Sequence, residues 1–396
     1  MSTTLTLEPS REKHQEFQPL VRVACLNKAG HTDDPDMPMC APLRSKVAAV
    51  LLALLLPGVE AAGAQSRFPG AEWTRAASPE SVGWDGAKLR AAFDYADSIG
   101  SSAIMVIHNG QVVAEHGNTA QKLHVFSVRK SFQSALVGLL VADGRLSLDA
   151  TLATLGIDDI EPSLTDVEKQ ATVRHLLMAR SGVYHEAAYE TPGMVNRRPA
   201  RGTHKPGEFW FYNNWDFNAL GTIIERAAGK SMFELFDERI AKPIGMQDFH
   251  VSDGEVVREA ASAHGAHVFR MSARDVARFG LLYLERGRWN DRQIIPEAWV
   301  RESTQPHTDI GLLGGYGYLW WVALRGKHFL STEAPEGTYS ARGTGEQNLV
   351  IYPAWNLVVV HRADAEGARR RGEPFVRVTN FARLLQGILA ARPSSR

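Results

Sequence analysis

The chain has little cysteine and no excess of charge of either sign. Its 396 residues include two cysteines, Cys25 and Cys40, and equal numbers of acidic and basic residues. Because both cysteines lie near the start of the chain, the remainder cannot use disulfides, thiol catalysis or cysteine-based zinc sites. The balanced charge gives no reason to expect binding to nucleic acid or to an anionic membrane.

A short apolar run, Val47 to Val59, has the pattern of a secretory signal. Arg44 and Lys46 precede this run, and Ala62-Gly63-Ala64 follows it as a small-residue cleavage site. The run is too short to span a bilayer comfortably, and a buried helix or an uncleaved anchor is the alternative. We therefore expect a signal peptide over residues 37–64 and an exported protein, periplasmic or secreted, with no stable membrane insertion after cleavage.

The segment before this signal is polar and shows no periodic pattern. Signal peptides begin near the start of translation, so we expect translation to begin at Met37 or Met39. Residues 1–36 are then a non-native or disordered extension. Residues 65–396 remain as one expected domain.

Secondary-structure signals divide this domain into a sheet part and a helical part. Alternating segments at 103–107 and 112–115, joined by an Asn-Gly turn, predict a β-hairpin, and β-rich segments return after residue 296. Helix signals dominate between these two regions, and a further amphipathic helix closes the chain. The predicted helices cover residues 172–179, 216–228, 231–241, 272–286 and 374–391. Ser272 and Asp275 have the spacing of a capping box at the start of the helix over 272–286.

This order predicts an α/β (α+β) fold in which one antiparallel sheet is built from both chain ends and flanked by helices. The sheet subdomain covers about 65–126 and 296–396, and an inserted, mostly helical subdomain covers about 127–295. We expect the functional cleft between the two subdomains.

Ser127-Val128-Arg129-Lys130 places a hydroxyl and an amine three residues apart at the start of a strong helix pattern. If the helix begins at Ser127, Lys130 lies one turn further on the same face. A desolvated lysine near other positive charge has a lowered pKa and can take the serine proton. Ser-x-x-Lys alone is a weak pattern, so its value depends on a second motif.

Tyr212-Asn213-Asn214 supplies that second motif. A tyrosine beside a lysine can share a proton and serve as a general base or as an acid to the leaving group. An asparagine offers both a donor and an acceptor, so Asn214 can hold a lysine and a substrate carbonyl together.

With these motifs the chain resembles the serine β-lactamase and penicillin-binding-protein-like hydrolases, in the class C-like branch with Tyr-x-Asn. That branch includes class C β-lactamases, D,D-carboxypeptidases, esterases and 6-aminohexanoate-dimer hydrolases. Three further stretches carry the resemblance: His175 to Gly182, Pro243 to Met246, and Met271 to Gly280. The resemblance implies a β-lactamase/transpeptidase-like fold with Ser127 as nucleophile and Lys130 and Tyr212 as proton-transfer groups.

The family's third motif, Lys-Thr-Gly or His-Thr-Gly, corresponds here to Ala341-Arg342-Gly343. The first cation is missing, and strand alternation should point Arg342 away from the face of residue 341. In the family this cation helps to hold a substrate carboxylate, so its absence favours an ester or amide without one. Gly343 still allows close backbone approach, and the N–H of Thr344, beside that of Ser127, is the expected second oxyanion donor.

Other candidates have simpler interpretations. His124, just before the nucleophile, is expected to pack or hydrogen-bond near the cleft, because Lys130 already occupies the place of the base. His264 and His267 form a weak ligand set, so no metal site is expected. No metal or organic cofactor is required by this chemistry.

We therefore expect an exported serine hydrolase that forms a covalent acyl-enzyme on a carboxylic ester or small amide. Ser127, Lys130 and Tyr212 are the catalytic residues, and Asn214, Gly343 and Thr344 form the substrate and oxyanion site. One alternative is the same chemistry on β-lactams or cell-wall D-peptides (as a β-lactamase, D,D-carboxypeptidase or D-aminopeptidase). The other is an inactive envelope binding module. The sequence does not reveal the oligomeric state.

Overall fold

The computed structural model describes residues 67–329 and 332–393. The predicted signal peptide and the N-terminal extension therefore lie outside the described residues. Within the described ranges, no helix has the length and apolar character needed to cross a bilayer.

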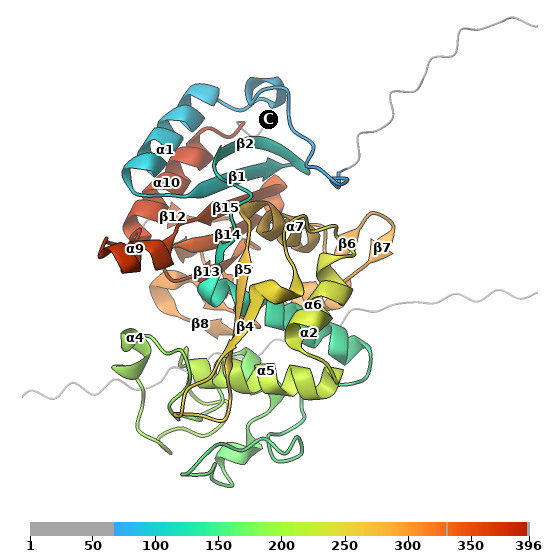
Figure 1. Ribbon diagram of the computed structural model, residues 1–396, viewed down its shortest axis with the longest axis vertical. Helices are drawn as coiled ribbons and strands as arrows, with labels where there is room; N and C mark the ends of the chain where they lie inside the picture. The colour runs from blue at the N-terminus through green and yellow to red at the C-terminus, as the bar shows by residue number, and fades with distance from the viewer. Residues whose placement is uncertain (1–66, 330–331, 394–396) are drawn as a thin grey trace, which may run out of the picture. The chain divides into compact units, whose positions relative to one another are not determined.

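An antiparallel sheet of eight strands joins the two ends of the described chain (Figure 1). The N-terminal hairpin pairs with the last strand of the sheet, and Val106 lies opposite Val359. This pairing confirms the prediction that both chain ends build one sheet. In spatial order the strands are β2 (Gln111–Gly117), β1 (Ala103–His108), β15 (Leu357–Arg362), β14 (Gln347–Tyr352), β13 (Tyr339–Gly343), β10 (Trp321–Val322), β9 (Gly315–Tyr316) and β8 (Thr308–Asp309).

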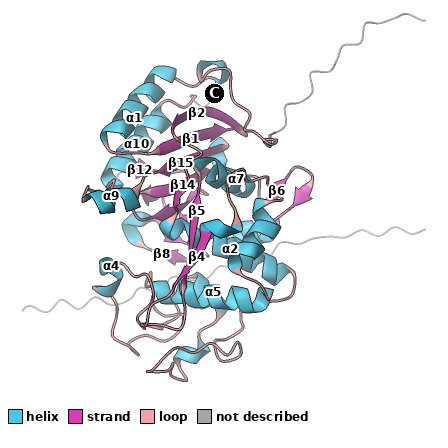
Figure 2. Cartoon of the chain, viewed as in Figure 1, coloured by secondary structure: helices cyan, strands magenta, loops and turns pink. Residues whose placement is uncertain are grey.

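Helices cover both faces of this sheet because the side chains of its central strands alternate between two apolar clusters. Ile104 and Val106 pack in the cluster shared with α1 (Gly86–Ser98) and α10 (Val378–Ala390). Met105 and Ile107 point to the opposite cluster, which includes α2 (Arg129–Ala142) and α7 (Ala273–Leu284). Figure 2 shows these helices beside the strands.

The remaining elements are short, apart from α5 (Asn214–Ala228). The remaining helices are α3 (Val173–Leu177), α4 (Pro192–Val195), α6 (Met232–Phe236), α8 (Glu297–Ser303) and α9 (Ala365–Arg371). The smaller sheets contain β3 (Leu123–His124), β5 (Ala266–Met271) and β4 (Gly254–Val257); β6 (Arg288–Trp289) and β7 (Arg292–Gln293); and β11 (Lys327–Phe329) and β12 (Thr332–Glu333).

The predicted helices are confirmed with shifted ends, but two local predictions are wrong. The helix-dominated interpretation of the region 127–295 missed β4, which has four residues, and β5, whose residues are buried on both faces and so do not alternate. Ser272 caps α7 by accepting the Asp275 N–H at 3.2 Å, yet Asp275 completes no capping box. Its carboxylate instead accepts N–H groups from residues 247, 248 and 249, so it anchors the preceding loop.

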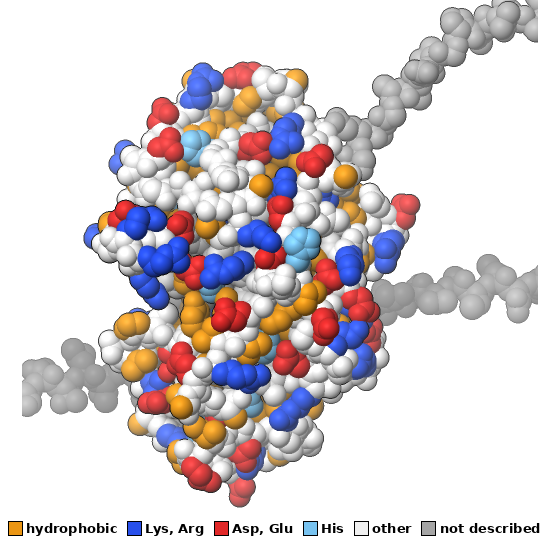
Figure 3. Space-filling view, viewed as in Figure 1, with side chains coloured by type: hydrophobic (Ala, Val, Ile, Leu, Met, Phe, Trp, Pro, Cys, Tyr) orange, Lys and Arg blue, Asp and Glu red, His pale blue; other side chains and the backbone are white. Residues whose placement is uncertain are grey.

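On the face shown in Figure 3, acidic and basic side chains are interspersed. This distribution agrees with the equal numbers of the two kinds of residue in the sequence.

Candidate active site

Ser127 lies in a tight turn at the start of the buried helix α2. The turn, Phe126–Val128, is a 3-10 helix, and α2 itself begins at Arg129, two residues later than the sequence predicts. The spacing still brings the two side chains together, because the Nζ of Lys130 donates to the Oγ of Ser127 at 2.7 Å. The pair is therefore formed by one short stretch of chain.

Lys130 is held in surroundings that disfavour its charge. Only 2% of the residue is exposed, and its burial, together with the neighbouring Arg129 charge, holds the pKa of the amine well below its usual range. Its Nζ lies 4.9 Å from the Tyr212 ring centroid and 4.8 Å from that of Phe217. These rings favour the cation but are weaker than the full desolvation of an amine. A neutral Lys130 can accept the Ser127 proton.

Arg129 is a residue whose role the sequence did not suggest. It is 1% exposed, and its guanidinium donates to the Oδ1 of Asn218 at 3.1 Å. Burial lowers its pKa to about 10, so it remains charged at neutral pH. This fixed charge supplies the positive potential that the Ser-x-x-Lys hypothesis requires beside Lys130.

Tyr212 lies against the same serine from the chain segment that leads into α5. Burial raises the pKa of its phenol to about 12, although a hydrogen bond with Ser127 and the Arg129 charge oppose the rise. The phenol therefore keeps its proton at neutral pH. The sequence left two roles open for Tyr212. A protonated phenol favours proton donation over action as a phenolate base.

The two asparagines after Tyr212 have different partners. Asn213 caps α5, since its Oδ1 accepts the Asp216 N–H at 2.9 Å. The side-chain amide of Asn214 donates to the Tyr189 carbonyl, and its Oδ1 is buried without a partner among the described residues. Among the described residues Asn214 makes no hydrogen bond to Lys130, although its Oδ1 has no other partner.

Asp216 is a second residue that sequence reasoning missed. It is fully buried, and burial raises the pKa of its carboxyl to about 8. The Ser181 hydroxyl donates to it. Ser181 belongs to the His175–Gly182 stretch that carries the family resemblance, so this stretch braces the first turn of α5.

Gly343 brings the end of β13 against the turn that contains Ser127. A Cβ on this glycine would lie 2.6 Å from the Val125 carbonyl oxygen and 3.1 Å from the Ser127 amide nitrogen. The need for glycine therefore comes first from backbone packing on the turn, and not from the approach of a substrate. Thr344 follows directly, so the placement is compatible with its predicted role as an oxyanion donor.

The residues before Gly343 face opposite sides of β13, as strand alternation predicts. Ala341 is 2% exposed and belongs to the apolar cluster around α2. Arg342 donates to the Ser340 Oγ at 2.8 Å and to the His328 carbonyl at 2.7 Å, and its guanidinium lies 3.9 Å from the Phe329 ring centroid. The cation of Arg342 therefore does not replace the one missing at Ala341.

The three histidines considered in the sequence, His124, His264 and His267, contact neighbouring residues. The Nδ1 of His124 accepts the Phe126 N–H at 2.7 Å, in agreement with the expected hydrogen-bonding role. His264 contacts the Thr222 hydroxyl at 2.9 Å, and His267 contacts Glu225 at 3.0 Å. In residues 67–329 and 332–393, no group of three or more His, Cys, Asp or Glu side chains is arranged to hold a metal ion.

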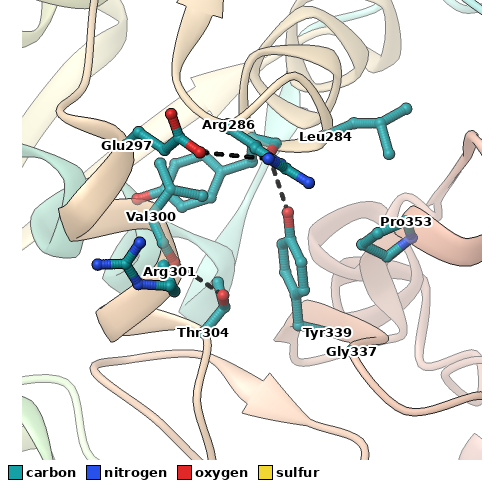
Figure 4. Close-up of a pocket in the computed structure, with 10 residues that line it drawn as sticks. Leu284, Arg286, Glu297, Val300, Arg301, Thr304, Gly337, Tyr339 and Pro353 are labelled. Carbon is teal, nitrogen blue, oxygen red and sulfur yellow. Dashed lines mark hydrogen bonds and ion pairs between the residues drawn. The ribbon is translucent and has the colours of Figure 1, made fainter. Parts of the chain in front are cut away.

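A separate cavity of about 320 Å³ lies between α7, α8 and the segment leading into β13 (Figure 4). Tyr339 and Tyr283 line it, and the Tyr339 hydroxyl donates to the Tyr283 carbonyl at 3.0 Å. None of Ser127, Lys130 and Tyr212 is among its lining residues. The chemistry of the motifs is therefore concentrated elsewhere, at the start of α2.

The fold and the paired motifs define a hydrolase of the β-lactamase/transpeptidase-like class. The family model described as Beta-lactamase matches residues 87–374, and the chain belongs to this family.

Individual relatives are distant. The chain is 25% identical to the uncharacterized protein BpOF4_21049 of Alkalihalophilus pseudofirmus over 301 residues, which cover 67% of this chain and 84% of that protein. It is 28% identical to esterase EstB of Burkholderia gladioli over 48% of this chain and 57% of EstB. A solved 6-aminohexanoate-dimer hydrolase candidate from Bacillus anthracis has a TM-score of 0.56 and 24% identity, over 75% of this chain and 80% of its own. This structural likeness supports the fold.

Proposed function

We propose that this protein is an exported serine hydrolase that cleaves a carboxylic ester or a small amide through an acyl-enzyme. The observation that carries the proposal is the 2.7 Å contact between the Ser127 Oγ and a buried lysine whose pKa is held low. A neutral amine at hydrogen-bond distance is what activates a serine without histidine.

In the proposed reaction, the Ser127 Oγ attacks the substrate carbonyl carbon while the Lys130 Nζ takes its proton. The Ser127 N–H and, by our assignment, the Thr344 N–H stabilise the oxyanion. Tyr212 donates its proton to the leaving alcohol or amine and regains one from Lys130. Water then attacks the acyl-Ser127 ester with the same groups acting in reverse, which releases the acid.

The substrate preference follows from the third motif. A substrate carboxylate would find the buried methyl group of Ala341 where the family has a cation, and the Arg342 guanidinium is bonded to Ser340 and His328. We therefore assign substrates that lack this carboxylate. The similarity to EstB agrees with an ester. Export rests on the signal-peptide pattern at residues 37–64.

The test compares kcat/KM of residues 65–396 on p-nitrophenyl butyrate and on nitrocefin, with Ser127→Ala as the blank. We expect ester turnover that disappears in the variant and little nitrocefin turnover. Dominant, Ser127-dependent nitrocefin turnover would make the protein a β-lactamase and overturn the argument from Ala341. If Ser127 reacts with neither substrate nor a fluorophosphonate, the protein is an inactive binding module.

A further inference from the structure

Tyr189 adopts a backbone conformation that side chains rarely take, with φ of +66°. Both backbone polar groups of Tyr189 form hydrogen bonds. Its N–H donates to Glu259 at 3.1 Å, and its carbonyl accepts the amide of Asn214. One residue earlier, the Ala188 carbonyl accepts the amide of Asn218 at 3.0 Å. Two asparagines one turn apart on α5 thus fix the loop, and such enforced strain is typical of functional sites.

The side chain of Tyr189 reaches in the other direction, to the nucleophile turn. Its hydroxyl lies 3.1 Å from the Nε2 of His124, and the two rings stack with centroids 5.8 Å apart. Because the Nδ1 of His124 accepts the Phe126 N–H, a neutral imidazole must carry its proton on Nε2. Burial lowers the pKa of His124 to about 4, so the ring is neutral at neutral pH and donates to Tyr189.

Phe126 stands directly before Ser127 and is itself strained, with φ of +48°. Its N–H bond to His124 holds the turn that presents the nucleophile. A continuous set of contacts therefore runs from Phe126 through His124 and Tyr189 to Asn214. It joins the two motifs of the site, which lie far apart in the sequence.

We propose that Tyr189 is a positioning residue that holds the Ser127 turn, through His124, in fixed relation to Asn214. The proposal rests on the hydrolase function proposed above. Tyr189 takes no part in bond making: its hydroxyl accepts from His124 and its carbonyl accepts from Asn214.

The same segment of chain contains a matched control. The Tyr184 hydroxyl lies 3.0 Å from the Nδ1 of His204, and the two rings meet edge to face. This tyrosine–histidine pair resembles the Tyr189–His124 pair in chemistry and has no hydrogen bond to Ser127, Lys130, Tyr212 or Asn214 among the described residues. Tyr184→Phe removes an equivalent phenol bond without touching the nucleophile turn.

The experiment uses Tyr189→Phe, His124→Asn, the double variant and Tyr184→Phe. An asparagine at position 124 can still accept the Phe126 N–H, since this side chain commonly bonds the backbone two residues on, but it is too short to reach Tyr189. For each protein we measure kcat and KM on p-nitrophenyl butyrate, the second-order rate of Ser127 modification by a fluorophosphonate, and Tm.

Each single change should lower kcat and the modification rate about tenfold, as expected when a buried hydrogen bond is broken, with KM nearly constant. The double variant should be no slower than either single variant, because both remove the same bond. Tyr184→Phe should keep the kcat of the unaltered protein, while its Tm should fall by about as much as the Tm of Tyr189→Phe.

Unchanged kcat in Tyr189→Phe, or effects that multiply in the double variant, would overturn the proposal. If Tyr189→Phe does not fold, His124→Asn carries the same test alone. Failure of the unaltered protein to react at Ser127 would instead reject the proposed hydrolase function, and the positioning role with it.

Discussion

The two helices that meet at the candidate site begin in different ways. α5 has an ordinary start, where the Asn213 side chain caps the first turn and Asp216 is braced by Ser181. α2 begins through a strained 3-10 turn and has no side-chain cap. The start of α5 therefore carries a side-chain cap, whereas the start of α2, beside Ser127, has none.

The start of α5 holds neighbouring residues in place, whereas the start of α2 lies beside Ser127 and Lys130. The helix dipole at the start of α2 favours negative charge beside Ser127 and disfavours a protonated Lys130. The capped start of α5 fixes the adjacent segment, from which Tyr212 reaches Ser127 and Asn214 holds the Tyr189 carbonyl. If this account holds, changes at the start of α2 should act mainly on kcat, and loss of the Asn213 cap of α5 mainly on stability.

The largest effect is expected at the start of α2, for Lys130→Met. Loss of the base should lower kcat on p-nitrophenyl butyrate by about 1,000-fold, within the range for general-base catalysis. Because methionine suits a buried position better than an amine does, Tm should not fall. Activity within tenfold of the unaltered protein would show that Lys130 is not the base.

A smaller loss is expected when the nucleophile turn is disturbed from outside, by Gly343→Ala. The added Cβ would press on the Val125 carbonyl and the Ser127 amide, so β13 must move away. We expect kcat to fall about 100-fold, as for loss of an oxyanion donor. Gly70→Ala, where nothing lies within 4 Å of the new Cβ, is the control and should be silent in kcat and Tm. Equal behaviour of the two variants would contradict the packing argument.

Asn213 and Asn214 are adjacent in one motif, so they allow loss of the α5 cap to be compared directly with loss of a contact to the Tyr189 loop. Asn213→Ala removes the cap of α5 and should cost about 1 kcal/mol of unfolding free energy, with kcat little changed. Asn214→Ala should lower kcat about tenfold, because it frees the Tyr189 loop and removes a buried hydrogen bond. Urea unfolding and steady-state kinetics on both variants give the comparison. A reversed pattern would mean that the capped start of α5 takes part in the chemistry.

The smallest effect expected is a change in the pH dependence of stability when Asp216 is replaced. Burial raises the pKa of its carboxyl to about 8 from an ordinary 3.8, so the folded state holds a proton that the unfolded state releases. Its contribution to stability is therefore lost as pH rises from about 4 through 8. Asp216→Asn, whose amide oxygen can still accept from Ser181, should lose less Tm between pH 6 and pH 9. An unchanged slope would show that the carboxyl is ionised in the folded protein.

Contacts that are local in sequence could be predicted, and most contacts fixed by tertiary packing could not. Ser127 and Lys130 are three residues apart, so helix geometry alone brings them together. That Arg342 cannot replace the cation missing at Ala341 also followed from strand alternation. The contacts of Tyr189 could not be predicted, because its partners His124 and Asn214 lie 65 and 25 residues away in the sequence. The sequence analysis placed the start of α2 two residues too early. The turn at Phe126 depends on the hydrogen bond from its N–H to His124, and not on local helix propensity.

The most direct test of the central claim is to locate the site of covalent modification by a fluorophosphonate with intact-protein and peptide mass spectrometry. The account predicts one phosphonyl group per chain, on Ser127, formed rapidly in the unaltered protein and much more slowly in Lys130→Met. Ester turnover without modification of Ser127, or modification that persists in Ser127→Ala, would contradict it.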